Sequence, residues 1–123
     1  WLRQFSNKVG FSDHTSPANT ALKASKLAIA LEADFVERHF TVLEPNETRD
    51  GPVSINPKQL RELCEFAKLP VETRLEKLTA DWQEWNVGLG DRTRELSATE
   101  LLNRDYYSGR VASWRNGEQV FNK

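Results

Sequence analysis

Two short apolar segments, each running into polar residues and a histidine, enclose a single helical segment near the start of the chain. The first segment reads Val9-Gly-Phe-Ser-Asp-His14-Thr, and the second reads Ala33-Asp-Phe-Val-Glu-Arg-His39-Phe-Thr. These segments contain both histidines of the 123-residue sequence. A strand, a helical crossover and a second strand form the right-handed parallel unit of an α/β sheet, with strands about 4.8 Å apart. The pattern predicts that both histidines emerge at the same carboxyl edge of one sheet.

Turn and cap residues set the expected boundaries of the other elements. We expect strands over 9–12 and 34–37, joined by one helix over 17–31 that begins at Ser16 and Pro17. Helices are expected over 57–68, 71–85 and 98–105, the last opened by a Ser97-Ala-Thr-Glu100 capping box. Asn116-Gly117 predicts a hairpin with strands over 110–114 and 118–122. The opening Trp1–Phe5 is typical of the last turns of an amphipathic helix.

Composition excludes several classes of protein. Charged residues make up 28% of the sequence and the formal net charge is -1. Lys and Arg are spread along the chain, so we expect no nucleic-acid partner. No apolar run is long enough to span a membrane. The lone cysteine, Cys64, excludes an internal disulfide and favours a reducing cytoplasm. Its place in an apolar helical pattern predicts a buried side chain.

The two strand-end histidines are the candidate chemistry of the chain. Neutral imidazoles on adjacent strand ends can chelate one divalent ion and leave coordination positions open. Asp13 and Glu37 are further ligands or carboxylates that orient an imidazole. Asp13 is equally plausible as a turn residue. The Ser12 hydroxyl either binds a phosphate oxygen or satisfies a neighbouring carbonyl, whereas Arg38 is expected to form a salt bridge toward the helix layer.

The combined motifs resemble the sialic acid synthase (NeuB-like) family. The resemblance covers residues 8–67 and rests on Ser-Asp-His-Thr, Glu-Arg-His-Phe-Thr, a following Gly-Pro, and Val-Ser-Ile-Asn-Pro, in that order. It implies an α/β fold that is the C-terminal portion of a (β/α)₈ barrel, with the last two parallel strands, extra helices and a C-terminal hairpin. It also implies an enzyme that condenses phosphoenolpyruvate with an N-acetylmannosamine-type sugar, releasing phosphate.

The resemblance implies a role for each candidate residue. His14 and His39 correspond to the two histidine ligands of a divalent metal, manganese or magnesium, that acts as a Lewis acid on the sugar aldehyde. Ser12 corresponds to a phosphoenolpyruvate contact. The family motif has an aspartate after Gly-Pro that contacts the sugar. Here Asp50 precedes Gly51-Pro52, so Asp50 is the candidate for that catalytic role.

The resemblance also sets expectations for the chain as a whole. We expect a partial barrel segment over residues 1–105 and a hairpin tail over 106–123, without the antifreeze-like domain that usually follows. The family's phosphate-binding lysines and catalytic glutamates lie on earlier strands, so the chain alone is expected to be inactive. The intact protein is expected to be a homodimer. The alternatives are a non-catalytic or barrel-completing module and another metal-dependent, aldolase-like enzyme acting on phosphoenolpyruvate.

Overall fold

A computed structural model describes residues 2–91 and 93–121, with the side chains of 111–113 left aside. The chain divides into two compact units, residues 1–90 and residues 91–123. The domain boundary expected after residue 105 stays a prediction. In the first unit, a single 3-10 turn (η1, Leu2–Gln4) stands where helix turns were expected, and Trp1 lies outside the described residues.

The expected parallel strand pair is present in the first unit. Strand β1 (Gly10–Asp13) pairs in parallel with β2 (Phe35–Arg38), with Gly10 opposite Phe35. Both strands begin one residue later than expected. Asp34 explains this shift, because its side chain accepts a hydrogen bond from the Val9 N–H and its own N–H donates to the Val9 carbonyl. These bonds fix the entry of both strands and confirm the α/β unit.

An isolated parallel β-bridge, which the sequence did not predict, follows β2. Phe40 forms a parallel bridge with Ile55, and the Ile55 N–H donates to the His39 carbonyl at 2.8 Å. Between them lies a loop with one 3-10 turn (η2, Gly51–Val53). Ile55 is 1% exposed. The sheet therefore contains the two expected strands, and this isolated bridge extends the pairing beyond β2.

The crossover is not the single helix predicted over 17–31. It consists of α1 (Pro17–Thr20) and α2 (Lys23–Ala30), separated by Ala21 and Leu22 in the left-handed backbone region. Left-handed conformations are costly for residues with a Cβ, so packing must compensate. Leu22 is 2% exposed and packs with Ile55 and Leu63. Burial of this side chain overrides the local preference for a continuous helix.

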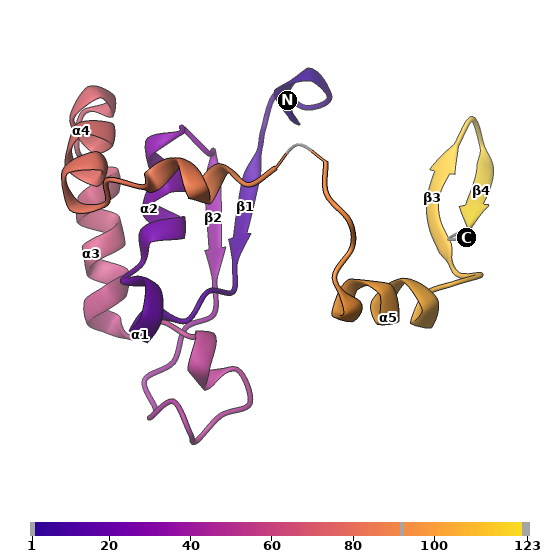
Figure 1. Cartoon of the computed structure of the whole chain (residues 1–123), viewed down its shortest axis with the longest axis horizontal. Helices are drawn as coiled ribbons and strands as arrows, with labels where there is room; N and C mark the ends of the chain where they lie inside the picture. Colours follow the sequence, from indigo (N-terminus) through magenta and orange to yellow (C-terminus); the bar gives the residue numbers. More distant parts are fainter. Residues whose placement is uncertain (1, 92, 122–123) are drawn as a thin grey trace. The chain divides into compact units, whose positions relative to one another are not determined.

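Helices α3 (Pro57–Ala67) and α4 (Val71–Asp81) lie on the far side of α2 from the strands (Figure 1). An Asn56 capping box begins α3, as the Asn-Pro pair predicts. Two clusters of buried residues form the core: the first contains Leu22, Ile55 and Leu63, and the second core cluster contains Leu27, Ala30, Phe66 and Leu78. Cys64 is exposed, so its predicted burial was wrong. Leu63 and Phe66 occupy the buried face of α3, which leaves Cys64 on its flank.

The predicted helix over 71–85 ends early. Helix α4 stops at Asp81, and a 3-10 turn (η3, Trp85–Leu89) follows. Trp82 and Trp85 are partly buried and pack against the second core cluster, which supports their expected role as packing residues. Within the described residues, no helix is both long and apolar enough to cross a bilayer.

The second unit contains α5 (Ala98–Tyr106), β3 (Val111–Arg115) and β4 (Glu118–Phe121). The Ser97 capping box and the antiparallel hairpin are both confirmed. Asn116 and Gly117 have φ values of 53° and 82°, as a tight hairpin turn with two left-handed residues requires. Asn122, the last residue expected in this hairpin, lies outside the described residues.

Candidate functional site

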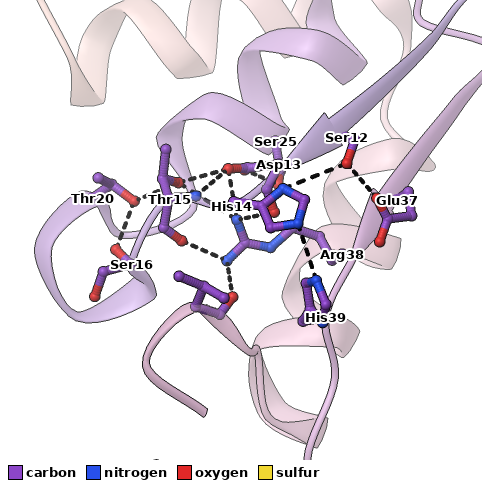
Figure 2. Close-up of polar contacts among 11 residues, drawn as sticks. Ser12, Asp13, His14, Thr15, Ser16, Thr20, Ser25, Glu37, Arg38 and His39 are labelled. Atoms are coloured by element: carbon purple, nitrogen blue, oxygen red, sulfur yellow. Dashed lines mark hydrogen bonds and ion pairs between the residues drawn. The ribbon is translucent and has the colours of Figure 1, made fainter. Parts of the chain in front are cut away.

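Alternation along the two strands separates the candidate residues into two groups. Ser12 lies opposite Glu37 in the parallel register, and Asp13 lies opposite Arg38. Successive side chains of a strand point to opposite faces. Figure 2 shows Ser12, Glu37 and the two histidines on one side, and Asp13 with Arg38 on the side of the crossover helix. The sheet edge therefore carries an exposed polar group above a buried ion pair.

The two histidines meet, as the strand spacing predicts. Nε2 of His14 and Nε2 of His39 lie 3.0 Å apart, and the ring planes are inclined by 65°. This separation suits a hydrogen bond when one nitrogen carries a proton. It also suits two ligands of one ion, because nitrogens each about 2.1 Å from a metal and at right angles are about 3.0 Å apart. The pair therefore fits a divalent cation.

Ser12 and Glu37 lie beside the histidine pair. The Ser12 hydroxyl donates a short hydrogen bond to Oε2 of Glu37, and its oxygen lies 3.5 Å from Nδ1 of His14. Among the described residues, the Ser12 hydroxyl bonds this carboxylate, whereas the simpler of its two expected roles was a bond to a neighbouring carbonyl. The carboxylate, hydroxyl and imidazole thus form one polar chain across the two strands.

Asp13 is the most enclosed charged side chain of the site. It is 1% exposed, and its carboxylate accepts hydrogen bonds from the Thr15 N–H at 2.8 Å, the Thr15 hydroxyl at 2.7 Å and the Ser25 hydroxyl at 2.5 Å. Burial by itself raises the pKa of Asp13. The hydrogen bonds from Ser25 and Thr15, with the charge of Arg38, outweigh burial and lower that pKa. The interpretation of Asp13 as a turn residue is confirmed.

Arg38 joins three segments of the sheet edge. Its Nη1 lies 2.7 Å from the Asp13 carboxylate, in a pair whose side chains are 4% and 0% exposed. The guanidinium also donates to the carbonyls of Asp13, Thr15 and Val53. The predicted salt bridge toward the helix layer is therefore confirmed. Its further role, holding the segment after β1 against the loop after β2, could not be found from sequence because it depends on backbone carbonyls.

Asp50 lies near His39, on the loop that follows β2. Its Oδ2 is 4.0 Å from Nδ1 of His39, and its side chain is 58% exposed. The next residue, Gly51, is buried, and a Cβ there would lie 2.0 Å from the Pro45 carbonyl oxygen. The loop that carries Asp50 therefore folds closely on itself at Gly51 and Pro45.

The described part of the chain contains no group of three or more His, Cys, Asp or Glu side chains positioned for a metal ion. The structure brings together Ser12, His14, Glu37 and His39, with Asp50 at the margin, and directs Asp13 away. Further ligands for an ion at the histidines would have to be water, substrate or groups outside the described residues.

A model of the NeuB family matches residues 2–98, which is most of the chain. The chain belongs to the NeuB family. It is thus a member of a sialic acid synthase-like family, which at this level denotes synthase-type transferases. The NeuB match includes both histidine motifs and ends at the first residue of α5.

One similar protein is the uncharacterized protein MJ1065 of Methanocaldococcus jannaschii, 34% identical over 65 residues. This alignment covers 53% of the present chain and 18% of the relative, so the chain corresponds to less than a fifth of that protein. No solved structure matches the chain.

Proposed function

We propose that this chain is part of a synthase that condenses phosphoenolpyruvate with an N-acetylmannosamine-type sugar to form a sialic, or nonulosonic, acid with release of phosphate. Its parallel unit would then be a segment of a (β/α)₈ barrel. The observation that carries the proposal is the pair of imidazole Nε2 atoms 3.0 Å apart at the carboxyl end of adjacent parallel strands. Barrel enzymes place their chemistry at that end of the strands.

His14 and His39 are the residues that would hold a divalent metal, manganese or magnesium. When bound, the metal polarises the aldehyde oxygen of the open-chain sugar. The His39 side chain is 34% exposed, so solvent reaches this residue. Two protein ligands leave coordination positions for water and substrate oxygens.

Asp50, on the loop beside His39, would act on the sugar directly by accepting a hydrogen bond from one of its hydroxyls; its Oδ2 lies 4.0 Å from Nδ1 of His39. In the proposed reaction, C3 of phosphoenolpyruvate forms the new bond to the aldehyde carbon, water adds its oxygen at C2, and phosphate leaves. Arg38 is turned to the opposite face, where it pairs with Asp13, so it would not be the cationic group that binds the phosphate.

A second candidate function, a barrel-completing or non-catalytic module, is favoured by apolar grooves beside both strands. One groove, of about 530 Å³, runs along β2 and α3, and another, of about 600 Å³, runs along β1 and α2. Their apolar lining includes Phe35, Val36, Phe40, Leu60 and Cys64 in the first, and Val9, Phe11, Ala24, Ala28 and Leu31 in the second. Open sheet edges with apolar flanks need a covering segment.

The test is phosphate release from phosphoenolpyruvate in the presence of N-acetylmannosamine and Mn²⁺, using the protein with all its natural segments. We expect His14→Ala and His39→Ala each to abolish the metal-dependent reaction, because each removes one of two protein ligands. Circular dichroism should show an intact fold, since neither imidazole is in the core.

The matched control is Lys58→Ala, an exposed position on α3. Its rate should equal that of the unmodified protein. Full activity in either histidine variant contradicts the proposed metal site. A folded protein that binds Mn²⁺ but shows no condensation with any of a panel of amino sugars favours the non-catalytic module.

A further inference from the structure

His14 is exposed at the surface, so the position of its ring depends mainly on the backbone that carries it. We propose that Asp13 and Arg38 are positioning residues, which hold the backbone around His14 and His39 so that the two imidazoles lie adjacent whether or not a metal is bound. The inference rests on the proposed function, because it assigns the buried ion pair to the proposed metal site. It gives the pair a role in binding in addition to its contribution to stability.

The backbone on both sides of His14 is bonded to one guanidinium (Figure 2). Nη1 of Arg38 donates to the Asp13 carbonyl at 3.0 Å, and Nη2 donates to the Thr15 carbonyl at 2.9 Å. The Asp13 carboxylate closes the same turn, because it accepts from the Thr15 N–H at 2.8 Å and lies 2.7 Å from Nη1 of Arg38. His14 is therefore the middle residue of a turn that is held at both ends, and this sets the direction of its side chain.

The same guanidinium reaches the segment that pairs with His39. Arg38 directly precedes His39 in the chain, and its Nη2 also donates to the Val53 carbonyl at 3.2 Å. Two residues further on, the Ile55 N–H donates to the His39 carbonyl at 2.8 Å. The Val53 N–H in turn donates to the Asp50 carbonyl at 3.2 Å. Arg38 thus connects the segments that carry both histidines and Asp50.

Burial makes these contacts a rigid support. The side chains of Arg38 and Asp13 are 4% and 0% exposed, so water does not compete for their hydrogen bonds. A guanidinium is a planar fork whose N–H groups point in fixed directions, so its acceptors keep fixed positions relative to one another. Residues of a binding site must be held within about 0.5 Å of the required geometry. The buried pair supplies this support for two Nε2 atoms that lie 3.0 Å apart.

The experiment uses Arg38→Lys in the protein with all its natural segments. Lysine keeps a positive charge for Asp13, but it lacks the fork that bonds three backbone carbonyls at once. We expect titration calorimetry with Mn²⁺ to show an affinity loss of about 10-fold or more, as is typical when a group that orients a metal ligand is lost. Circular dichroism should show an intact fold, because the buried charges remain paired.

A second measurement needs no metal. The ring centroids of His14 and His39 are 4.8 Å apart, so the metal-free protein should show a nuclear Overhauser effect between protons of the two rings. This effect should weaken or vanish in Arg38→Lys, because the turn that carries His14 is no longer bonded to the segment that carries His39. A purely stabilising pair would not change the contact between the rings in protein that remains folded.

Arg74→Lys is the matched control, because Arg74 also bridges backbone carbonyls, those of Ala67 and Leu69 between α3 and α4. It should change neither the Mn²⁺ affinity nor the Overhauser effect, even where it lowers the urea midpoint. If Arg38→Lys lowers the urea midpoint and leaves both measurements unchanged, the inference is overturned and the proposed function stands. If His14→Ala binds Mn²⁺ as well as the unmodified protein, the proposed function fails, and the Overhauser effect alone decides the inference.

Thr15→Val keeps the question open to test if Arg38→Lys does not fold. It removes the hydroxyl that donates to the Asp13 carboxylate at 2.7 Å and keeps the shape of the side chain. The Mn²⁺ affinity and the Overhauser effect should both fall, by less than in Arg38→Lys, because the guanidinium keeps its bonds to the carbonyls. A folded Thr15→Val protein with both measurements unchanged overturns the inference.

Discussion

The buried ion pair beneath the histidines offers the most demanding test of the structure. Substitution Asp13→Asn removes the negative charge and keeps the shape of the side chain. The amide oxygen can still accept from Thr15, so the main loss is the charge partner of Arg38, whose side chain is only 4% exposed. Leaving a buried charge without its partner costs about 3–5 kcal/mol.

The carbonyls of Asp13, Thr15 and Val53 still solvate the Arg38 guanidinium, so we expect the lower end of that range, about 3 kcal/mol. Small domains have a total stability of only about 5–15 kcal/mol. The loss should appear as a clear fall in the urea midpoint at neutral pH with an unchanged slope. Glu65→Gln, which removes a fully solvated ion pair with Lys68, should leave the midpoint unchanged within error.

A double-mutant cycle identifies the mechanism. Arg38→Met removes the buried cation, so Asp13→Asn combined with Arg38→Met should cost at least about 1 kcal/mol less than the sum of the single variants. Strict additivity of the two substitutions would refute the reasoning, because it would mean that the two side chains do not interact in the folded protein. A loss in Asp13→Asn no larger than in Glu65→Gln would refute it as well.

Three further predictions follow from the same region. Since the pKa of Asp13 is lowered in the fold, its contribution to stability is complete above its unfolded pKa of about 3.9 and is lost as the pH falls through the lower folded value. Acid titration of the urea midpoint should therefore be flatter in Asp13→Asn. Gly51→Ala should lower the melting temperature more than Gly10→Ala, although the added Cβ would clash in both variants. At Gly51 the Cβ meets backbone, whereas at Gly10 it meets the ring of Phe35, which is 59% exposed and can turn away. Equal melting temperatures of the two variants would contradict this reasoning. Asp50→Asn should weaken sugar affinity, and unchanged affinity across a sugar panel rejects the proposed contact.

Much of the fold could be predicted because local signals and tertiary packing agree. The Asn56 and Ser97 capping boxes, the Asn116-Gly117 turn and the parallel strand pair each depend on contacts near in sequence or on one repeating unit. The break at Ala21 and Leu22 could not be predicted, because the sequence there favours a helix. The packing of Leu22 against Ile55 and Leu63 explains why the helix is interrupted at Leu22.

The candidate site also contains features that could be predicted from the sequence and features that could not. The order of the strands alone predicts that His14 and His39 lie close together. Because successive side chains of a strand point to opposite faces, Arg38 is directed toward the helix layer. The choice of Ser12 between a carbonyl, an anion and a carboxylate could not be made from sequence, because Glu37 is 25 residues away and the register had to be known to one residue. The sequence also predicted that Cys64 is buried, but Cys64 is exposed because Phe66 occupies the buried face of the helix.

The parallel register has a consequence for how this protein can vary. Every pair from Gly10 with Phe35 to Asp13 with Arg38 is offset by the same number of residues, and the offset continues to the two histidines. A slip of one residue would turn all side chains of β2 to the opposite face and part the imidazoles. An insertion or deletion within either strand would cause such a slip, so functional homologues should confine length changes to the connecting segments. The loop over 44–50 follows both histidines in the chain, so a change in its length would not alter the pairing of β1 with β2.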